Sequence, residues 1–174
     1  GLTYRPGTPT IEAMNKAVRT AVRAFIVDQS RLLVIAMRDE EGVFYILPGG
    51  GQLHGETLPQ ALEREVREET GTRIRVGPLL YVREYIGRNH TFARRHKHFH
   101  QLETVFKCSL ESGQPALGRG ADKRQIGIEW LELAKIHEYR FYPEVLQSCV
   151  LEGEIRVDPV YMGDINSIKP VVIP

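Results

Sequence analysis

The sequence lacks the marks of a membrane protein, a disulfide-rich secreted protein or a metal-cluster protein. It contains two cysteines, Cys108 and Cys149, with no metal-type spacing, so we expect reduced core thiols. No run of about 18 apolar residues occurs, and no membrane span is expected. No secretory signal pattern opens the chain. These absences favour a cytoplasmic protein with no membrane partner.

A large charge of one sign is also missing, as are repeats and low-complexity segments. The formal net charge is +1, which gives no electrostatic footprint for a nucleic-acid partner. Hydrophobic residues make up 42% of the chain and charged residues 26%, which are ordinary globular values. With 174 residues, we expect one domain over 1–174, with a core at about 18–152, an N-terminal arm at 1–16 and a C-terminal tail at 158–174.

The stretch 57–70 carries the clearest local signals in the chain. Thr57 followed by Gln60 is typical of a capping box at the start of a helix. Gly71 can take the left-handed conformation that ends one. Pro59 is tolerated because it falls in the first turn. The stretch therefore predicts one helix.

One face of this helix combines apolar and acidic residues. At about 100° per residue, the helix has one apolar arc that must face a core, formed by Leu58, Leu62 and Val66. Glu69 falls inside that arc, and Glu65 and Glu68 lie at its edge. A buried, unpaired carboxylate is too costly to keep ionised. A hard cation such as Mg²⁺ would remove this cost, because it takes carboxylate oxygens as ligands.

An ordinary charged helix is the competing interpretation. Its acids would be solvated or paired with arginines, since Arg64 and Glu68 are spaced i,i+4, as are Glu63 and Arg67. This interpretation explains Glu63 and Arg67 well. It does not explain a glutamate at position 69, in the apolar arc.

Together with the glycines that precede it, the helix resembles the Nudix box of the MutT-like Nudix hydrolases. The segment Pro48-Gly49-Gly50-Gly51 is a loop that only glycine could form. The residues that match the box at its required spacings are Gly50, Glu56, Arg64, Glu65, Val66, Glu68, Glu69 and Gly71. Thr72 departs from the pattern, which has an aliphatic residue there. So many specified positions in one short stretch make a chance match very unusual.

The resemblance implies an α/β fold, the Nudix α/β/α sandwich with a mixed central β-sheet and the Nudix loop and helix. The order of the expected elements fits this fold. They are strands at 18–27, 32–37, 43–47, 73–86, 99–110 and 126–131, a helical turn at 133–137 and a helix at 143–152. The long strand at 73–86 is expected to break at Gly77-Pro78.

The resemblance also implies a Mg²⁺ site, for which Mn²⁺ is an expected substitute. The ligands that it implies are Glu65, Glu68, Glu69 and the carbonyl of Gly50. Glu56 would act through a bound water or as an outer support. Arg64 should orient the carboxylates rather than touch the metal, because two cations repel each other.

The general base stays open among several acids. Glu65 or Glu68 could serve, and some family members use an acid from a later loop. The later acids in this chain are Glu103, Glu111 and Asp122. We prefer Asp122, because it lies just before the strand that ends at Trp130, although solvated charges are the simpler interpretation of all three.

Basic and aromatic residues outside the box are candidates for substrate binding. Arg38 ends a strand, and Arg94 and Arg95 belong to a basic loop at 88–97 that could receive phosphates or could simply be solvated. Tyr142 is a candidate to stack on a nucleobase. The other aromatic candidates are Tyr45, Trp130 and Phe141, and core packing is favoured for Trp130.

Three histidines alternate at the end of the basic loop. On a strand, His96, His98 and His100 would share one face, and such a triplet can hold a transition metal. A polar strand entrance beside the active site is the simpler interpretation.

The function that the resemblance implies is hydrolysis of a pyrophosphate bond, in a nucleoside diphosphate linked to a group X, by water attack on phosphorus. One alternative is a non-catalytic Nudix-fold module that binds a nucleotide or nucleotide sugar, and intact Glu65, Glu68 and Glu69 argue against it. Another is an RNA 5′-end pyrophosphohydrolase, which the basic loop keeps open. We expect a small nucleotide-type substrate, no nucleic-acid partner and, from the proline-bearing ends, a homodimer as one option. In this fold, the loops outside the box determine which group X is recognised.

Overall fold

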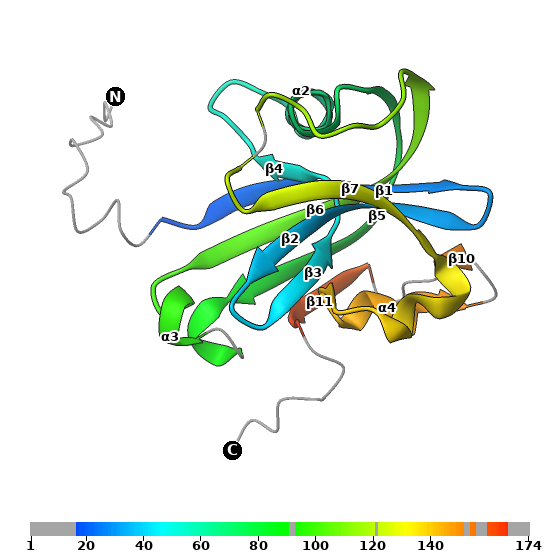
Figure 1. Cartoon of the computed structure of the whole chain (residues 1–174). Helices are drawn as coiled ribbons and strands as arrows, with labels where there is room; N and C mark the ends of the chain where they lie inside the picture. Colours follow the sequence, from blue (N-terminus) through cyan, green and yellow to red (C-terminus); the bar gives the residue numbers. More distant parts are fainter. Residues whose placement is uncertain (1–16, 91–92, 121, 152–153, 156–159, 167–174) are drawn as a thin grey trace, which may run out of the picture.

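The computed structural model describes residues 17–90, 93–120, 122–151, 154–155 and 160–166 (Figure 1). The arm predicted at 1–16 lies outside these residues. The elements in chain order are β1 (Arg19–Asp28), β2 (Arg31–Asp39), β3 (Gly42–Ile46), β4 (Gly49–Gly51), α2 (Leu58–Thr70), β5 (Arg73–Ile86), η1 (Gly87–Asn89), α3 (Ala93–His96), β6 (His100–Ser112), β7 (Gln125–Glu132), η2 (Leu133–Glu138), β8 (Phe141–Tyr142), α4 (Val145–Cys149), β9 (Val150–Leu151), β10 (Glu154–Ile155) and β11 (Tyr161–Asp164).

Nine of the described strands form one mixed sheet. Its order is β11-β5-β6-β1-β2-β3-β8, with β4 paired to β1 and β7 paired to β2. The pairs β1–β6, β3–β8 and β5–β11 are parallel, and the other pairs are antiparallel. Helix α2 covers one side of the sheet, whereas η2 and α4 lie on the other (Figure 1). The predicted α/β fold with a mixed central sheet is therefore confirmed.

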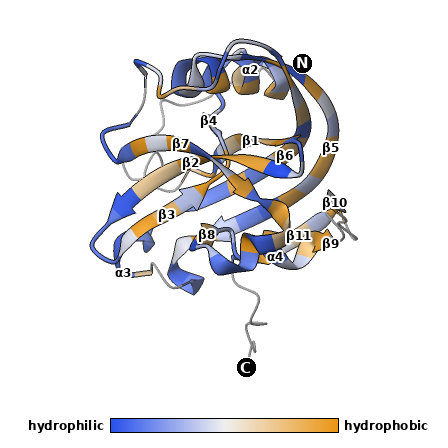
Figure 2. Ribbon diagram, turned by 45° about the vertical axis from the view of Figure 1, so that its right-hand side comes forward, coloured by the Kyte–Doolittle hydropathy of each residue, from blue (hydrophilic) through white to orange (hydrophobic). Residues whose placement is uncertain are grey.

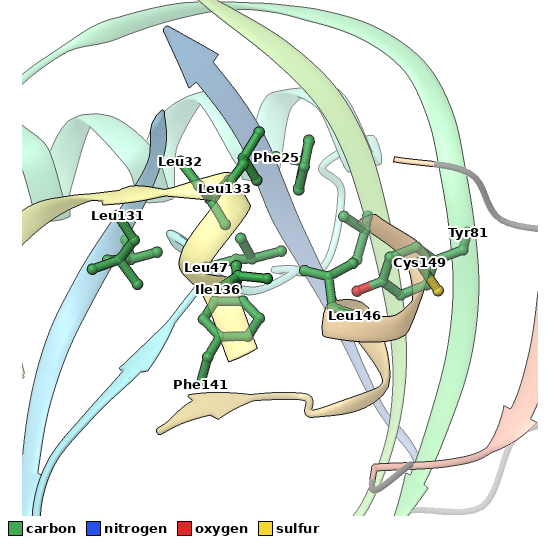
Figure 3. Packing of buried hydrophobic residues seen from close by; sticks show 12 residues of the cluster. Phe25, Leu32, Leu47, Tyr81, Leu131, Leu133, Ile136, Phe141, Leu146 and Cys149 are labelled. Carbon is green, nitrogen blue, oxygen red and sulfur yellow. The ribbon is translucent and has the colours of Figure 1, made fainter. Parts of the chain in front are cut away.

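The central strands are buried on both faces, which explains why their sequences are continuous apolar runs rather than alternating ones. In β2, Leu33 packs under α2, whereas its neighbours Leu32 and Val34 point to the opposite side. Figure 2 shows the apolar residues on the central strands, between α2 and α4. Figure 3 shows the second core, in which side chains of η2 and α4 meet those of Phe25, Leu47 and Tyr81. The sheet is thus a rigid support for whatever lies along its edges.

A tight turn joins the first two strands, and one local prediction in the strands is confirmed. The hairpin β1–β2 turns at Gln29 and Ser30, both with positive φ (47° and 60°). The pairing of β5 with β6 shifts register between Val76 and Leu79, which places a break at Gly77-Pro78 as expected. No helix in the described residues is long and apolar enough to cross a membrane.

One prediction near the C-terminus is wrong, and the structure contains a strand there that the sequence did not predict. The helix predicted at 143–152 ends at Cys149, because Val150 and Leu151 pair with Glu154 and Ile155 as a small hairpin. The segment predicted to be a tail contains β11, which extends the sheet beside β5. A strand of four residues that contains a glycine with positive φ gives almost no periodic signal in the sequence.

Candidate active site

Helix α2 has the ends that the sequence predicts. The Thr57 hydroxyl accepts the Gln60 N–H, and the Gln60 side chain accepts the Thr57 N–H at 2.8 Å. Gly71 ends the helix in the left-handed conformation, with φ of 68°. These caps fix which residues fall on the inner face. That face includes Glu69, which is 5% exposed among apolar neighbours.

The glycine segment before the helix was predicted to be a loop, but residues 49–51 form the short strand β4, because they pair with β1. The segment is pressed between β1 and α2. Gly49 has φ of 138°, and a Cβ there would lie 2.1 Å from the carbonyl oxygen of Val22. A Cβ at Gly50 would lie 2.4 Å from the carboxyl carbon of Glu65. The missing side chain at Gly50 therefore makes a cradle in which the Glu65 carboxylate rests directly on the backbone.

Arg64 gathers the acids around this loop. Its guanidinium forms a bidentate pair with Glu56, at 2.6 and 3.0 Å. It also donates to Glu65 at 2.8 Å, to Glu68 at 3.4 Å and to the carbonyl of Gly51 at 3.0 Å. The hydrogen bonds from Arg64 lower the pKa of Glu56 to about 2, so that carboxylate is ionised at neutral pH.

Glu69 is held by two donors from distant parts of the chain. One oxygen accepts the N–H of Gly49 at 2.8 Å, and the other accepts the Gln125 amide at 2.6 Å. Burial raises the pKa of Glu69 above its usual value, against these two hydrogen bonds. Gln125 was not identified from the sequence, because a glutamine at the start of a strand carries no local signal for such a contact.

The loop between β6 and β7 holds the C-terminal end of α2. The N–H groups of Ala116, Gly118 and Gly120 donate to the carbonyls of Thr70, Glu69 and Glu68. Helix ends leave such carbonyls without intrahelical partners, so the loop satisfies them and fixes the turn that carries the acids.

The late acids differ sharply in their surroundings. Asp122 lies in the β6–β7 loop, 53% exposed, and its backbone N–H donates to the side chain of Gln125. Glu103 lies inside β6 rather than in a loop, with both oxygens taken by Arg83 and Arg23. Glu111, at the far end of β6, pairs with an exposed arginine. Asp122 thus stays the preferred late-loop candidate.

The donor set around Gly50 fits a hard divalent cation. Within the described residues, no three His, Cys, Asp or Glu side chains form a ready-made metal site, and Arg64 lies among the carboxylates instead. The Glu65 and Glu68 carboxylates and the backbone carbonyls are all oxygen donors, the type that Mg²⁺ and Mn²⁺ prefer. The Gly50 cradle leaves the Glu65 carboxylate directly beside the loop backbone.

A cavity of about 670 Å³ is lined by Arg19 and Arg23, which contact Gly51 and Gly49 of the glycine segment. Arg38, Arg95 and Tyr142 line it, as expected for substrate-binding residues, whereas Arg94 is not among its lining residues. Arg19 and Phe44 also line it and were not identified from the sequence. Strand pairing across the sheet brings Arg19 and Phe44 to the cavity, and no local sequence pattern reveals that pairing.

Arg19 joins the cavity to the glycine loop. Its guanidinium lies against Gly51, where a Cβ would be 2.9 Å from Nη2, and donates to Gln101 at 2.8 Å. Burial and the charge of Arg23 lower the pKa of Arg19, and the carboxylates of Glu65 and Glu103 oppose this shift. Among the described arginines of the cavity, Arg19 is thus placed next to the box acids.

Other aromatic candidates lie away from the cavity. Trp130 packs against the core under α2, which confirms the favoured interpretation. Phe141 is fully buried in the opposite core. The Tyr45 hydroxyl donates to Glu129, and its ring packs edge-on against Tyr139. None of these three lines the cavity.

The three histidines do not share one strand face, which contradicts the alternative of a histidine triplet for a transition metal. His96 ends the short helix α3, His98 lies in the turn after it, and His100 begins β6. The His96 ring is hydrogen-bonded to the Tyr85 hydroxyl at 2.9 Å, whereas the His100 ring is hydrogen-bonded to Glu84. The turn between α3 and β6 removes the period of two that the prediction assumed.

Comparison with known proteins agrees with this arrangement. A model of the NUDIX domain matches residues 17–148. The nucleoside triphosphatase NudI of Enterobacter sp. (strain 638) is 41% identical over 61 residues, which are 33% of this chain and 43% of that protein. NudI of Escherichia coli (strain SE11) is 41% identical over 59 residues, 32% of this chain and 42% of that protein. The matches thus span less than half of the length of these curated relatives.

Solved structures show the same fold. A MutT Nudix hydrolase from Burkholderia pseudomallei superposes with a TM-score of 0.55 and 27% identity, over 68% of this chain and 85% of that one. A Nudix hydrolase from Nitrosomonas europaea superposes with a TM-score of 0.58 and 22% identity, over 71% of this chain and 78% of that one.

Proposed function

The chain belongs to the Nudix family of hydrolases, and from that premise we propose that it is a divalent-metal-dependent enzyme that cleaves the pyrophosphate bond of a nucleoside diphosphate linked to a group X. The observation that carries this proposal is the placement of the box acids. Glu65 rests on Gly50, and Glu68 and Glu56 converge on Arg64. Arg19, which lines an arginine-rich cavity, lies against the adjoining Gly51. Acids alone would suit many metals, whereas acids beside a basic cavity suit a phosphorylated substrate.

Metal binding would use the oxygens of Glu65, Glu68 and Glu69 with the Gly50 carbonyl, and Mg²⁺ or Mn²⁺ held there would neutralise phosphate charge and lower the pKa of a bound water. Arg64 and the cation would compete for Glu65 and Glu68. The bidentate Arg64–Glu56 pair keeps Arg64 anchored to the loop during that competition. We assign Glu56 the role of outer support, because its two oxygens form the bidentate pair that anchors Arg64.

Substrate binding would place the phosphates toward Arg19, with Arg38 and Arg95 farther along the cavity wall. Phe44 and Tyr142, which pack edge-on with ring centroids 5.8 Å apart, offer apolar surface for a nucleobase. Water is the nucleophile, and Glu65, Glu68 or Asp122 would take its proton. Arg64 orients the acids and does not touch the reacting atoms.

The proposal is tested by chelation, a substrate panel and isotope labelling. After treatment with EDTA, the protein should hydrolyse nothing, and either Mg²⁺ or Mn²⁺ should restore turnover. The panel contains ADP-ribose, a nucleotide sugar, a dinucleoside polyphosphate, a nucleoside triphosphate (the type of substrate in the relatives' name) and a 5′-triphosphorylated RNA. In ¹⁸O-labelled water, mass spectrometry should find the label in a phosphate product. Hydrolysis that survives EDTA, or binding of nucleotides without hydrolysis under either metal, would contradict the proposal.

Replacing Arg19 by glutamine should raise KM for the best substrate of this panel about tenfold, because a charge-assisted contact to phosphate contributes roughly 1.5–3 kcal/mol. The change in kcat should be smaller, since Arg19 is not a ligand of the metal. Steady-state kinetics measure both constants. Arg31→Gln is the matched control, because it removes the same charge at another place, in the β1–β2 hairpin near Trp130. Equal KM values for the two variants would remove Arg19 from the substrate site.

Because the net charge is near neutral, RNA belongs to the substrate panel but is not the preferred substrate. A cytoplasmic location and a homodimer stay predictions for this chain.

A further inference from the structure

One residue that lines the cavity, Asn166, lies beyond the stretch that matches the family. The match to the family ends at residue 148, whereas β11 lies at Tyr161–Asp164. This strand pairs with β5 in parallel, through hydrogen bonds from the Val82 N–H to the carbonyl of Val160 and from the Ile165 N–H to that of Glu84. A segment outside the family match is therefore built into the sheet next to the cavity.

The end of this segment reaches the cavity directly. Asn166 is 5% exposed and is one of the residues that line the cavity. Arg83, also a lining residue, donates to the carbonyl of Ile165 at 2.8 Å and to the Asn166 side chain at 3.4 Å. The segment is thus attached to the buried ion pairs at the base of the cavity.

Asp164 attaches the same segment to the turn that follows β5. One carboxylate oxygen accepts the Ile86 N–H at 2.9 Å and lies in hydrogen-bond contact with Nε2 of His90. The other accepts the Asn89 side chain at 2.7 Å. The three donors come from five consecutive residues, so a single carboxylate organises the whole turn 86–90.

This turn in turn positions part of the cavity wall. The His90 ring stacks on Tyr85, with centroids 5.0 Å apart and planes 14° apart. The Tyr85 hydroxyl is hydrogen-bonded to His96 at 2.9 Å. Tyr85 and His96 both line the cavity, as does Arg95, which precedes His96 in α3. A continuous series of contacts therefore runs from Asp164 to the side chains that face the cavity.

We propose that Asp164 is a positioning residue for substrate binding, which sets the affinity for the nucleotide by holding the wall formed by Tyr85, Arg95 and His96. This proposal rests on the proposed function, because it requires the nucleotide to occupy the cavity. Asp164 does not touch substrate or the reacting atoms. It acts through the turn 86–90 and its stacking on Tyr85.

The test compares Asp164→Ala with Tyr161→Phe. The control removes a hydrogen bond from the same strand to Glu84, at a tyrosine that is 55% exposed and is not a lining residue of the cavity. The first readout is the Kd for ADP, measured by calorimetry in EDTA so that no turnover is needed. Asp164→Ala should weaken ADP binding about tenfold, and Tyr161→Phe should change it less than twofold. In Mg²⁺, Asp164→Ala should raise KM by the same factor and change kcat less than threefold.

A second readout separates the wall from general stability. Amide hydrogen exchange in peptides that contain His90 and His96 should accelerate in Asp164→Ala, while exchange in α2 stays as in the unmodified protein. Faster exchange across the whole chain, or ADP affinity equal to that of the control variant, would overturn the proposal. Failure of the proposed function would look different, since the unmodified protein would then bind ADP without hydrolysing any member of the panel. If the unmodified protein binds no ADP at millimolar concentration, the proposal falls as well.

Discussion

Glu65→Gln is expected to lower kcat at least about 100-fold, because it replaces the charged carboxylate that we propose as a metal ligand, at the point where the glycine segment meets the helix. The carboxylate rests on Gly50, and glutamine has nearly the same shape, so the fold should be retained. Steady-state kinetics in saturating Mg²⁺ measure the loss, and thermal melting checks the fold.

Glu63→Gln is the matched control for this substitution. Glu63 belongs to the same helix, is exposed and does not face the glycine segment. Its replacement by glutamine makes the same change of charge. It should retain nearly full activity. A Glu65→Gln variant with the activity of this control would show that Glu65 binds no catalytic metal.

Glu69→Gln would be a less clean test of the metal site. The two Glu69 oxygens accept from the Gly49 N–H and from the Gln125 amide. The NH₂ group of a glutamine would face one of these two donors. Two N–H donors would then meet in a buried place, and neither would have an acceptor. We therefore expect this variant to lose stability as well as turnover.

Glu103→Gln is expected to destabilise the protein by about 3–5 kcal/mol, because removal of one partner leaves buried charges uncompensated. Glu103 is 3% exposed and accepts from Arg83 at 2.7 Å and from Arg23 at 3.3 Å. Urea denaturation at neutral pH measures the loss. In Glu111→Gln, which breaks an exposed pair with Arg75, the loss should be below about 1 kcal/mol. Equal losses in the two variants would show that the buried pairs contribute nothing beyond an ordinary surface contact.

The same carboxylate should make stability depend on pH. Burial alone would raise the pKa of Glu103, but the charges of Arg83 and Arg23 outweigh it and hold the pKa below the ordinary value of 4.5. The contribution of Glu103 is therefore complete above that value and is lost as the pH falls through the lower, folded-state pKa. The difference in stability between the unmodified protein and Glu103→Gln should shrink correspondingly in acid.

Local patterns predicted the parts of the site that depend on neighbours in the chain. Thr57 and Gln60 specify the start of α2, and Gly71 its end, because caps involve residues three or four positions apart. The helical period then places Glu69 inward without further information. The glycines at 49–51 could be identified because few other residues tolerate such a backbone.

Contacts between distant segments could not be predicted in this way. Arg19 and Gln101 meet because β1 and β6 pair in parallel, and Gln125 meets Glu69 because β7 begins beside the helix. Glu103 was a candidate base in the sequence, since nothing near it in the chain shows that Arg83 and Arg23 surround it. Such pairings depend on topology, which a single sequence does not encode locally.

The three successive glycines of β4 have a consequence for how this enzyme could change. Each faces a different neighbour: the backbone of Val22, the carboxylate of Glu65 and the guanidinium of Arg19. No compensating change at one neighbour would make room at the other two. We therefore expect any change of substrate to come from side chains that line the cavity, such as Arg38 and Tyr142, and not from this segment.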